Sequence, residues 1–413
     1  MKTIKENHFG MSTILSFALI PISGFATDIY IPSLPSMANE LHVSSSAVQL
    51  SLILFMISGG ISQLFVGVLL DSFGRFKLNL AALLVFAFAS FVIALSGNIY
   101  TIYLMRILQG VTVALIVVAK RAYFVDIYSG EKLKHYISLF SIVWATAPII
   151  APFLGGYLQA AFGWQSNFYF LGGATVLIAG LEVLYSGESL KVFHPFKAKS
   201  ILEVYSSKIK TLDFTVGLFI LGLSYLIVVV HGMASPFIIE RVFHYSPVIT
   251  GYCALLSGIA LMTGGIISKM FINRPLLKKI GISIPLQLLL IIGMITTSIY
   301  RTNIFTLMAF TLLIHLMSGF TFNNVLTFCL GRFTKNAGMT AGIAGGSLYI
   351  ISSVLSYGII KQVTINSQLL LGGAYLGISI LLIVALVLFR KFRNVSELAT
   401  RSLDVNPILS RAA

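Results

Sequence analysis

Two charged residues, Asp28 and Arg106, stand inside long apolar stretches of this sequence. Asp28 follows a run of apolar and small residues that begins at Met11, and Arg106 lies within the apolar run 100–122. A charge inside such a segment is costly, so each side chain should face a partner or a water-filled cavity. Burial favours the neutral form of a carboxyl group, whereas a neighbouring guanidinium favours the ionised form. A carboxyl group poised between these influences can take up and release a proton.

Groups that would support catalysis or metal binding are missing from the sequence. It contains no phosphate-binding G-x-x-x-x-G-K-[ST] stretch, no C-x-x-C and no H-x-x-x-H. Cys253 and Cys329 both fall inside apolar runs, where a thiol packs as a small hydrophobic group. We therefore expect neither an enzyme nor an ATP-driven machine, and neither a metal nor a bound cofactor.

The elements that must position these residues are membrane-spanning helices. Of the 413 residues, 57% are hydrophobic and only 10% are charged, against about 25% charged in soluble proteins. A spanning helix needs about 20 apolar residues. The sequence predicts twelve such helices, at 11–34, 46–70, 77–97, 100–122, 136–159, 167–186, 212–236, 247–271, 280–300, 303–328, 339–360 and 368–389.

The basic residues indicate how these helices are oriented. The net charge is +15, but the 28 Lys and Arg residues are scattered over short connectors, which argues against a nucleic-acid partner. Most of them fall on alternate connectors, which places both termini in the cytoplasm. The longest connector, at about 187–211, separates six helices from six. The predicted domains are a six-helix bundle at 1–187, a cytoplasmic loop at 188–211, a second six-helix bundle at 212–390 and a cytoplasmic tail at 391–413.

Four stretches carry a resemblance to a known family. They are DIYIPSLPSMA at 28–38, GVLLDSFGRFK at 67–77, RILQG at 106–110 and APIIAPFLGG at 147–156. They match D-x-Y-x-P-x-x-P, G-x-x-x-D-x-x-G-R, R-x-x-Q-G and a proline-glycine motif of the fifth helix. The chain resembles the drug:proton antiporters of the major facilitator superfamily, of the twelve-helix Bcr/CflA type. The number of helices extends the resemblance over nearly the whole chain.

The resemblance implies a conformational latch at the corner formed by Gly67, Asp71, Gly74 and Arg75. Glycine permits a tight corner, and Asp71 can pair with Arg75 or face a helix N-terminus of the other bundle. Such a latch would hold the outward-facing state, although a plain charged turn has the same residues. The corresponding corner, GGIISKMFINR, has Lys269 where a carboxylate would stand. We therefore expect the latch in the first bundle only.

The fifth predicted helix contains Pro148, Pro152, Gly155 and Gly156. Prolines inside a helix interrupt its hydrogen bonds and bend it. The resemblance implies an antiporter motif, a bend that limits proton leak during exchange. The alternative is a kinked helix that serves packing alone.

Asp28 and Arg106 are the predicted proton-coupling residues. Each lies about 9 Å from the same membrane face at 1.5 Å per residue, and the first and fourth helices are neighbours in the fold that the resemblance implies. We expect a shared polar site, formed directly or through Gln109 or water, in which Asp28 carries the proton. A static ion pair is the alternative. Pro32 and Pro35 should break the first helix near Asp28.

Several polar and aromatic residues are candidates for a substrate cavity. They are Tyr30, Gln109, Lys120, Arg121, Trp144, His315 and Asn323. Lys120 and Arg121 either reach the cytoplasmic headgroups or attract anionic cargo. His315 is either a proton relay or cargo contact or a hydrogen-bonded packing residue.

The predicted function is secondary transport across the inner membrane. We expect a monomeric proton antiporter, driven by the proton gradient without a cofactor, that exports small amphipathic compounds or drugs by alternating access. Its partners are the cargo, protons and the lipid bilayer. A carrier of a polar anionic metabolite, such as a polycarboxylate siderophore, is the first alternative. A receptor or scaffold with an inactive transporter fold is the second.

Overall fold

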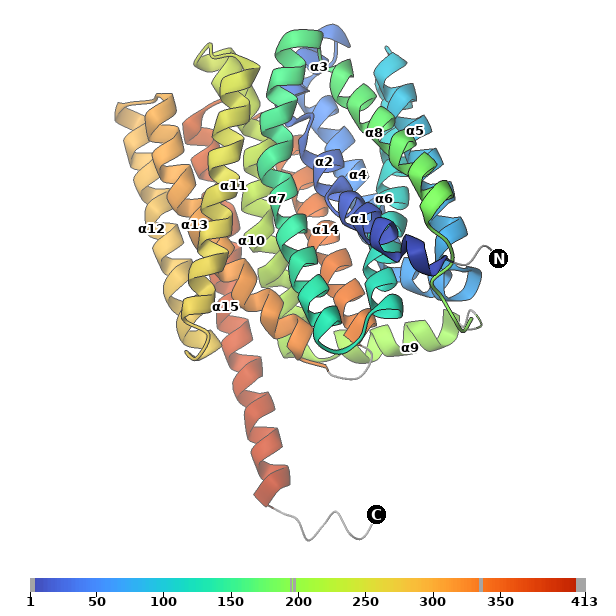
Figure 1. Cartoon of the computed structure of the whole chain (residues 1–413). Coiled ribbons are helices and arrows are strands. Elements are labelled where there is room, and N and C mark those ends of the chain that lie inside the picture. The colour runs from blue at the N-terminus through green and yellow to red at the C-terminus, as the bar shows by residue number, and fades with distance from the viewer. Residues whose placement is uncertain (1–3, 194, 196–197, 334–336, 406–413) are drawn as a thin grey trace.

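The computed structural model describes residues 4–193, 195, 198–333 and 337–405, and its elements there are helices. Twelve stretches of the described chain are long and apolar enough to span a membrane. The predicted all-α fold with twelve spanning helices is confirmed (Figure 1). Eleven of the spans are formed by α4 (Ser45–Phe73), α5 (Arg75–Leu95), α6 (Ile99–Ile127), α7 (Gly130–Phe162), α8 (Gln165–Tyr185), α10 (Leu212–Phe237) with the π-helical turn Ile238–Val242, α11 (Pro247–Met270), α12 (Leu276–Tyr300), α13 (Ile304–Gly331), α14 (Ala337–Gln362) and α15 (Gln368–Val405).

The first span is a series of short helices rather than one rod. It consists of α1 (Phe9–Leu19), α2 (Ile22–Asp28), a 3-10 turn (Ile31–Ser33) and α3 (Leu34–Glu40). Proline at the start of a helical segment is favourable, whereas it breaks hydrogen bonds in the interior, and Pro32 and Pro35 each stand at such a start. The span therefore continues to Glu40 instead of ending near residue 34. Asp28 is the last residue of α2, directly before the break.

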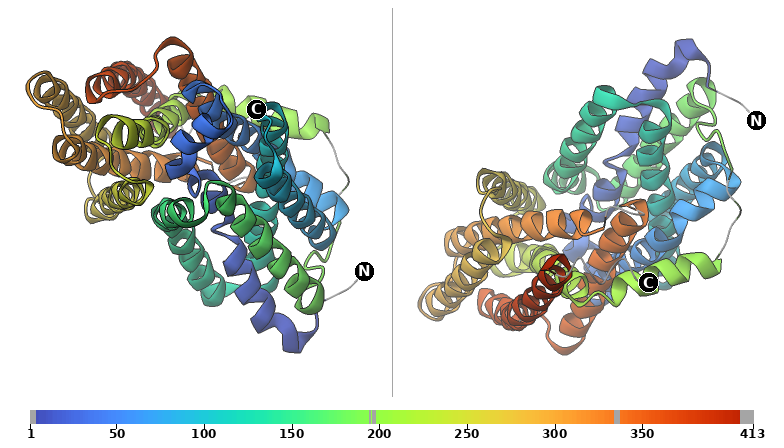
Figure 2. Two further views of the ribbon diagram at one scale, coloured as in Figure 1. Left: turned by 90° about the horizontal axis from the view of Figure 1, so that it is seen from above. Right: turned by 90° about the horizontal axis from the view of Figure 1, so that it is seen from below.

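The apolar core is divided between two halves of the molecule. One cluster is built mainly from residues of the first six spans, and a second from residues between Tyr205 and Phe389. Seen along the helices, the blue-to-green first half and the yellow-to-red second half lie side by side (Figure 2). Two helix pairs join the halves, because α4 packs along α14 and α7 packs along α11.

We call the end at which α4 turns into α5, and α11 into α12, the corner end, and the other the opposite end. By the distribution of basic residues the corner end is the predicted cytoplasmic end.

The central connector contains a helix, although a loop was predicted there. This helix, α9 (Ala198–Ile209), lies across the corner end (Figure 1). The Tyr205 hydroxyl donates to the carbonyl oxygen of Leu64 in α4, and Lys208 Nζ lies 2.8 Å from Thr340 Oγ1 in α14. Burial raises the pKa of the Tyr205 phenol, which keeps it protonated as a donor. The connector therefore touches both halves.

The last helix runs past the membrane span. The span ends at Arg393, but α15 continues to Val405, within the predicted tail 391–413. In Figure 1 its last turns project from the corner end. Residues 406–413 of that tail lie outside the described residues.

Candidate functional site

Asp28 lies where the two halves meet. The carboxyl group interacts electrostatically with Arg106 of α6, and its charge also acts on Tyr225 of α10 and Tyr349 of α14. The Asp28 side chain is half-buried. Among the residues that the structure describes, it forms no hydrogen bond or ion pair. Asp28 is thus half-buried, close to a cation and not fixed by a hydrogen bond or ion pair to a described residue.

Arg106 is fully buried beside it and is held by neutral groups. Its Nη1 donates to the carbonyl oxygen of Ala26 at 2.9 Å and to Gln109 Oε1 at 2.8 Å. The guanidinium carbon lies 4.6 Å from the ring centre of Tyr30 and 4.2 Å from that of Phe55. Aromatic faces attract a cation, most strongly where water is excluded. Nε and Nη2 of Arg106 have no hydrogen-bond partner among the described residues.

The residues around Arg106 are themselves fixed. Gln109 Nε2 donates to Ser90 Oγ at 2.8 Å, and the Tyr30 hydroxyl lies 3.1 Å from Ser51 Oγ. The structure therefore brings together four of the predicted residues: Asp28, Arg106, Tyr30 and Gln109. The static ion pair is not formed in this state, because no Asp28 oxygen lies within ion-pair distance of Arg106.

Lys120 and Arg121 lie away from this group. At 1.5 Å per residue, Lys120 is about 20 Å along α6 from Arg106. It is buried in the first half, and its Nζ lies 2.6 Å from Glu182 Oε2 in α8. Asn79 Nδ2 approaches the same oxygen at 3.5 Å. Lys120 therefore does not extend to the headgroups, and Glu182 neutralises its charge. Arg121 is exposed, with its guanidinium carbon 5.9 Å from the ring centre of Phe140.

The other three candidates are dispersed. Trp144 is half-buried and packs near Tyr123 and Phe140 in the first half. His315 is fully buried in the second half, with its ring centre 4.9 Å from that of His231 and neither ring nitrogen bonded to a described residue. Asn323 Nδ2 lies 2.5 Å from Ser268 Oγ near the corner end, which fixes its orientation. None of the three shares a contact with Asp28.

The predicted latch residues form an ion network within the first half. Arg75 Nη2 lies 3.0 Å from Asp71 Oδ1, and Arg75 Nη1 pairs with Asp126. Gly67, one turn before Asp71, has no neighbour close to the position of a Cβ atom. Gly74 has a φ of 95°, a conformation that favours glycine. Asp71 remains 44% exposed, so in this state the latch does not join the halves.

Glu188 completes this corner. Its two carboxylate oxygens accept from the backbone N–H groups of Arg75 and Phe76, both at 3.1 Å. The first N–H groups of a helix have no partner in the helix, and the helix dipole favours an anion there. The sequence analysis missed this residue, because nothing near position 188 indicates a contact with a helix that begins more than a hundred residues earlier.

The proline-glycine segment connects Asp28 to the second half. α7 continues through Pro148 and Pro152. Gly155 packs against the carbonyl group of Ile29, the residue after Asp28, and a Cβ atom on Gly156 would lie 2.6 Å from the carbonyl oxygen of Pro247 in α11. A side chain at either position would separate α7 from its neighbours. The predicted antiporter motif thus packs beside the predicted proton carrier.

The halves are closed at the opposite end. Arg241 Nη2 donates to Asn39 Oδ1 at 2.6 Å, and Gln49 Nε2 donates to the carbonyl oxygen of Met233 at 2.8 Å. The hydroxyls of Tyr157 and Tyr252 lie 2.9 Å apart. The sequence analysis missed these contacts, because each joins residues that are far apart in the chain.

Comparisons with known proteins agree with this geometry. A model of the Major Facilitator Superfamily matches residues 17–357. The chain is 29% identical over 352 residues to YdgK, an uncharacterized MFS-type transporter of Bacillus subtilis, covering 80% of this chain and 83% of YdgK. It is 25% identical over 397 residues to the multidrug resistance protein MdtL of Salmonella typhimurium, covering 93% and 96%. The crystal structure of a D-xylose-proton symporter superposes with a TM-score of 0.72 at 13% identity, covering 90% of this chain and 96% of that one. The chain belongs to the Major Facilitator Superfamily.

Proposed function

We propose that this protein exports small amphipathic compounds in exchange for protons. As a member of a transporter family it is a multi-pass protein of the inner membrane and not an enzyme. The observation that carries the proposal is the state of Asp28, a half-buried carboxyl without a fixed partner beside the buried guanidinium of Arg106. The name of its relative MdtL, a multidrug resistance protein, supports the kind of cargo.

In the proposed cycle, the charge of Asp28 controls a rotation of the two halves against each other, which opens the protein to one side of the membrane and then to the other. We assign the closed opposite end to the outer side of the membrane, because the basic connectors lie at the corner end. Protonation of Asp28 removes its attraction to Arg106. A proton can shift the balance between two states only through such a difference in interaction. The proton gradient then supplies the energy, and no cofactor takes part.

A polar anionic cargo is not favoured by the described residues. That alternative depended on the charge balance of the cavity, with Arg106, Lys120 and Arg121 set against Asp28 and Glu182. Glu182 neutralises Lys120 at 2.6 Å inside the first half, and Arg121 is exposed beside Phe140.

Transport in proteoliposomes with an imposed pH gradient tests the proposal. We expect gradient-driven movement of a fluorescent cationic drug in the unmodified protein and a fall of at least roughly a hundredfold in Asp28→Asn, as for loss of a group essential to proton transfer. Glu131→Gln is the matched control, because Glu131 is exposed and its ion-pair partner in the described part of the chain is the exposed Lys134. Undiminished transport by Asp28→Asn would contradict the role of Asp28 as the proton carrier. Faster movement of polycarboxylates than of cationic drugs would contradict an amphipathic cargo.

A further inference from the structure

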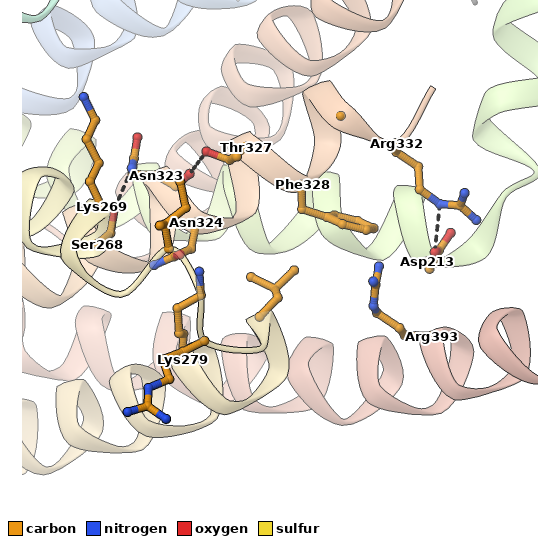
Figure 3. Close-up of a pocket in the computed structure, with 14 residues that line it drawn as sticks. Asp213, Ser268, Lys269, Lys279, Asn323, Asn324, Thr327, Phe328, Arg332 and Arg393 are labelled. Atoms are coloured by element: carbon orange, nitrogen blue, oxygen red, sulfur yellow. Dashed lines mark hydrogen bonds and ion pairs between the residues drawn. The ribbon is translucent and has the colours of Figure 1, made fainter. Parts of the chain in front are cut away.

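A pocket of about 900 Å³ lies at the corner end of the second half (Figure 3). It is an open cavity lined by residues of α10, α11, α12, α13 and α15 and of the connector between α11 and α12. Its one described acidic lining residue is Asp213. Its described basic lining residues are Lys269, Arg274, Lys279, Arg332 and Arg393. We call this cavity the basic pocket.

The basic pocket occupies the place that an acidic corner occupies in the first half. There, Asp71 and Asp126 bind Arg75, and the Glu188 carboxylate caps the N-terminus of α5. In the second half Lys269 stands where the first corner has Asp71. In the described part of the chain, no side chain accepts from the first N–H groups of α12, at Leu276 and Leu277. The second corner thus has a helix N-terminus, that of α12, and basic side chains, but the described residues there include no counterpart of Asp71 or Glu188.

The polar residues around the basic pocket are mostly engaged with one another. Asn323 binds Ser268 Oγ at 2.5 Å, and Thr327 Oγ1 donates to the Asn323 carbonyl oxygen at 2.8 Å (Figure 3). Asp213 Oδ2 lies 3.0 Å from Arg332 Nε, so this carboxylate already has a cation.

Three cations remain to interact with a ligand. Among the described residues, no carboxylate lies within ion-pair distance of Lys269, Arg274 or Lys279. In Figure 3 the side chain of Lys279 extends towards Asn324. The lining of the pocket thus carries an excess of positive charge.

The surroundings of the basic pocket place it at the membrane surface. Its residues stand at the ends of spanning segments, where lipid headgroups lie. Between α11 and α12, Met270 is 79% and Ile272 68% exposed, and such apolar side chains can enter the lipid beside the pocket. Basic pockets between helix ends attract anionic headgroups.

We propose that the basic pocket binds a phosphate-bearing anion, which supplies to the second corner the negative charge that Glu188 and Asp71 supply to the first. The phosphate belongs either to an anionic phospholipid headgroup or to a free phosphate in solution. Either source would be attracted by the charges of Lys269, Arg274 and Lys279 and would reduce the repulsion among them.

Thermal unfolding of the purified full-length protein in detergent tests this assignment. Phosphatidylglycerol, phosphatidylcholine and inorganic phosphate are titrated separately, and apparent affinities are taken from the rise in Tm. We expect phosphatidylglycerol to raise the Tm and phosphatidylcholine not to. Arg274→Gln with Lys279→Gln should weaken the apparent affinity for phosphatidylglycerol roughly tenfold or more, since each cation near a membrane surface contributes to attraction.

The matched control is Lys278→Gln with Lys391→Gln, which removes two exposed lysines at the same end that do not line the pocket. Arg274→Lys with Lys279→Arg keeps the charge and should keep the affinity. Lys269→Gln, at an exposed position, repeats the test if the first double variant folds poorly. A response to phosphatidylglycerol alone identifies a lipid headgroup, and an equal response to inorganic phosphate identifies a soluble anion. No response to either, or an equal loss in the control, overturns the proposal.

Discussion

The guanidinium of Arg106 is held by oxygens and aromatic rings rather than by a carboxylate. Ala26 and Gln109 accept its hydrogen bonds, and Tyr30 and Phe55 face it. The cation therefore keeps its position whether Asp28 is ionised or neutral. A fixed cation beside a carboxyl that can change its charge gives each protonation state a different energy.

Replacing Arg106 by lysine should impair transport although the charge is kept. An ammonium group lacks the planar fork that reaches Ala26 and Gln109 together and packs less well between two rings. Lost cation–π contacts at desolvated sites cost about 2 kcal/mol, so we expect Arg106→Lys to lower gradient-driven uptake into proteoliposomes by at least about tenfold. Arg121→Lys, at an exposed position, is the control. Equal rates in both variants would show that charge alone matters at position 106.

The pair of Lys120 and Glu182 should act on stability and not on cargo choice. Removing one partner of a buried pair costs about 3–5 kcal/mol, whereas replacing both by apolar groups is often neutral. We expect Lys120→Met to lower the Tm strongly and Lys120→Met with Glu182→Leu to restore it, with transport rates near those of the unmodified protein. Lys134→Met, in an exposed pair with Glu131, should change the stability by less than about 1 kcal/mol. Loss of drug transport in a stable double variant would instead place the pair in the transport path.

Residue types predicted part of the site. Asp28 and Arg106 were predicted because each is a charged residue within an apolar run, where a charge is costly unless it faces a partner or a cavity. The same signal at Lys120 and at Glu182 could not reveal that these two meet, since they are far apart in the sequence and come together through the fold, in which α6 and α8 both pack against α5. Glu188 was not predicted for the same reason, because the backbone N–H groups that it binds, at Arg75 and Phe76, are far away in the sequence.

α7 shows how one helix can serve both the site and the interface between the halves. It lies against the chain after Asp28 on one side and against α11 on the other. Backbone contacts at Gly155 and Gly156 make both approaches possible. A small change in the distance between α7 and α11 therefore reaches the surroundings of Asp28.

A methyl group on Gly156 should open the contact of α7 with α11. Its Cβ would lie 2.6 Å from the carbonyl oxygen of Pro247, so one helix has to move. Overpacking costs about 1–3 kcal/mol, which should reduce the population closed at the opposite end by about fivefold or more. The measurement is the yield of cross-linking by a short bismaleimide between Tyr157→Cys and Tyr252→Cys, in a background with Cys253 and Cys329 replaced by alanine. Gly173→Ala is the control, because nothing lies near its Cβ position, and an unchanged yield in Gly156→Ala would contradict the prediction.

At the scale of the whole molecule, hydropathy predicted the spanning helices and the short motifs predicted the family. The length and hydropathy of each apolar run suffice to predict the spanning helices, because a segment in lipid must form its backbone hydrogen bonds within itself. The broken first span was expected only in part: Pro32 and Pro35 indicated a break, but the continuation to Glu40 depends on packing of α3 against α4. The helix in the central connector was missed, because its amphipathic pattern is short and interrupted by lysines. The predicted monomeric state and domain limits stay predictions.

Contacts at the opposite end should set the balance between the two states. Arg241 binds Asn39 at 2.6 Å across the halves, and hydrogen bonds to charged groups contribute about 1.5–3 kcal/mol. We expect Arg241→Ala to lower the bismaleimide cross-linking yield of the same introduced cysteine pair by about tenfold or more. Arg301→Ala, an exposed arginine at the same end, should leave the yield unchanged. A yield in Arg241→Ala equal to that of the control would show that the ion contact does not hold this end closed.

The helix α9 gives the motion of the halves a mechanical limit. One of its residues, Tyr205, is bound to α4, and another, Lys208, is bound to α14. A short stiff rod attached to two bodies restricts the angle through which they can swing unless one attachment is released. Each transport cycle must then either stay within that angle or release the contact of Tyr205 with α4 or that of Lys208 with α14. The helix between the halves can therefore limit how far they rotate relative to each other during transport.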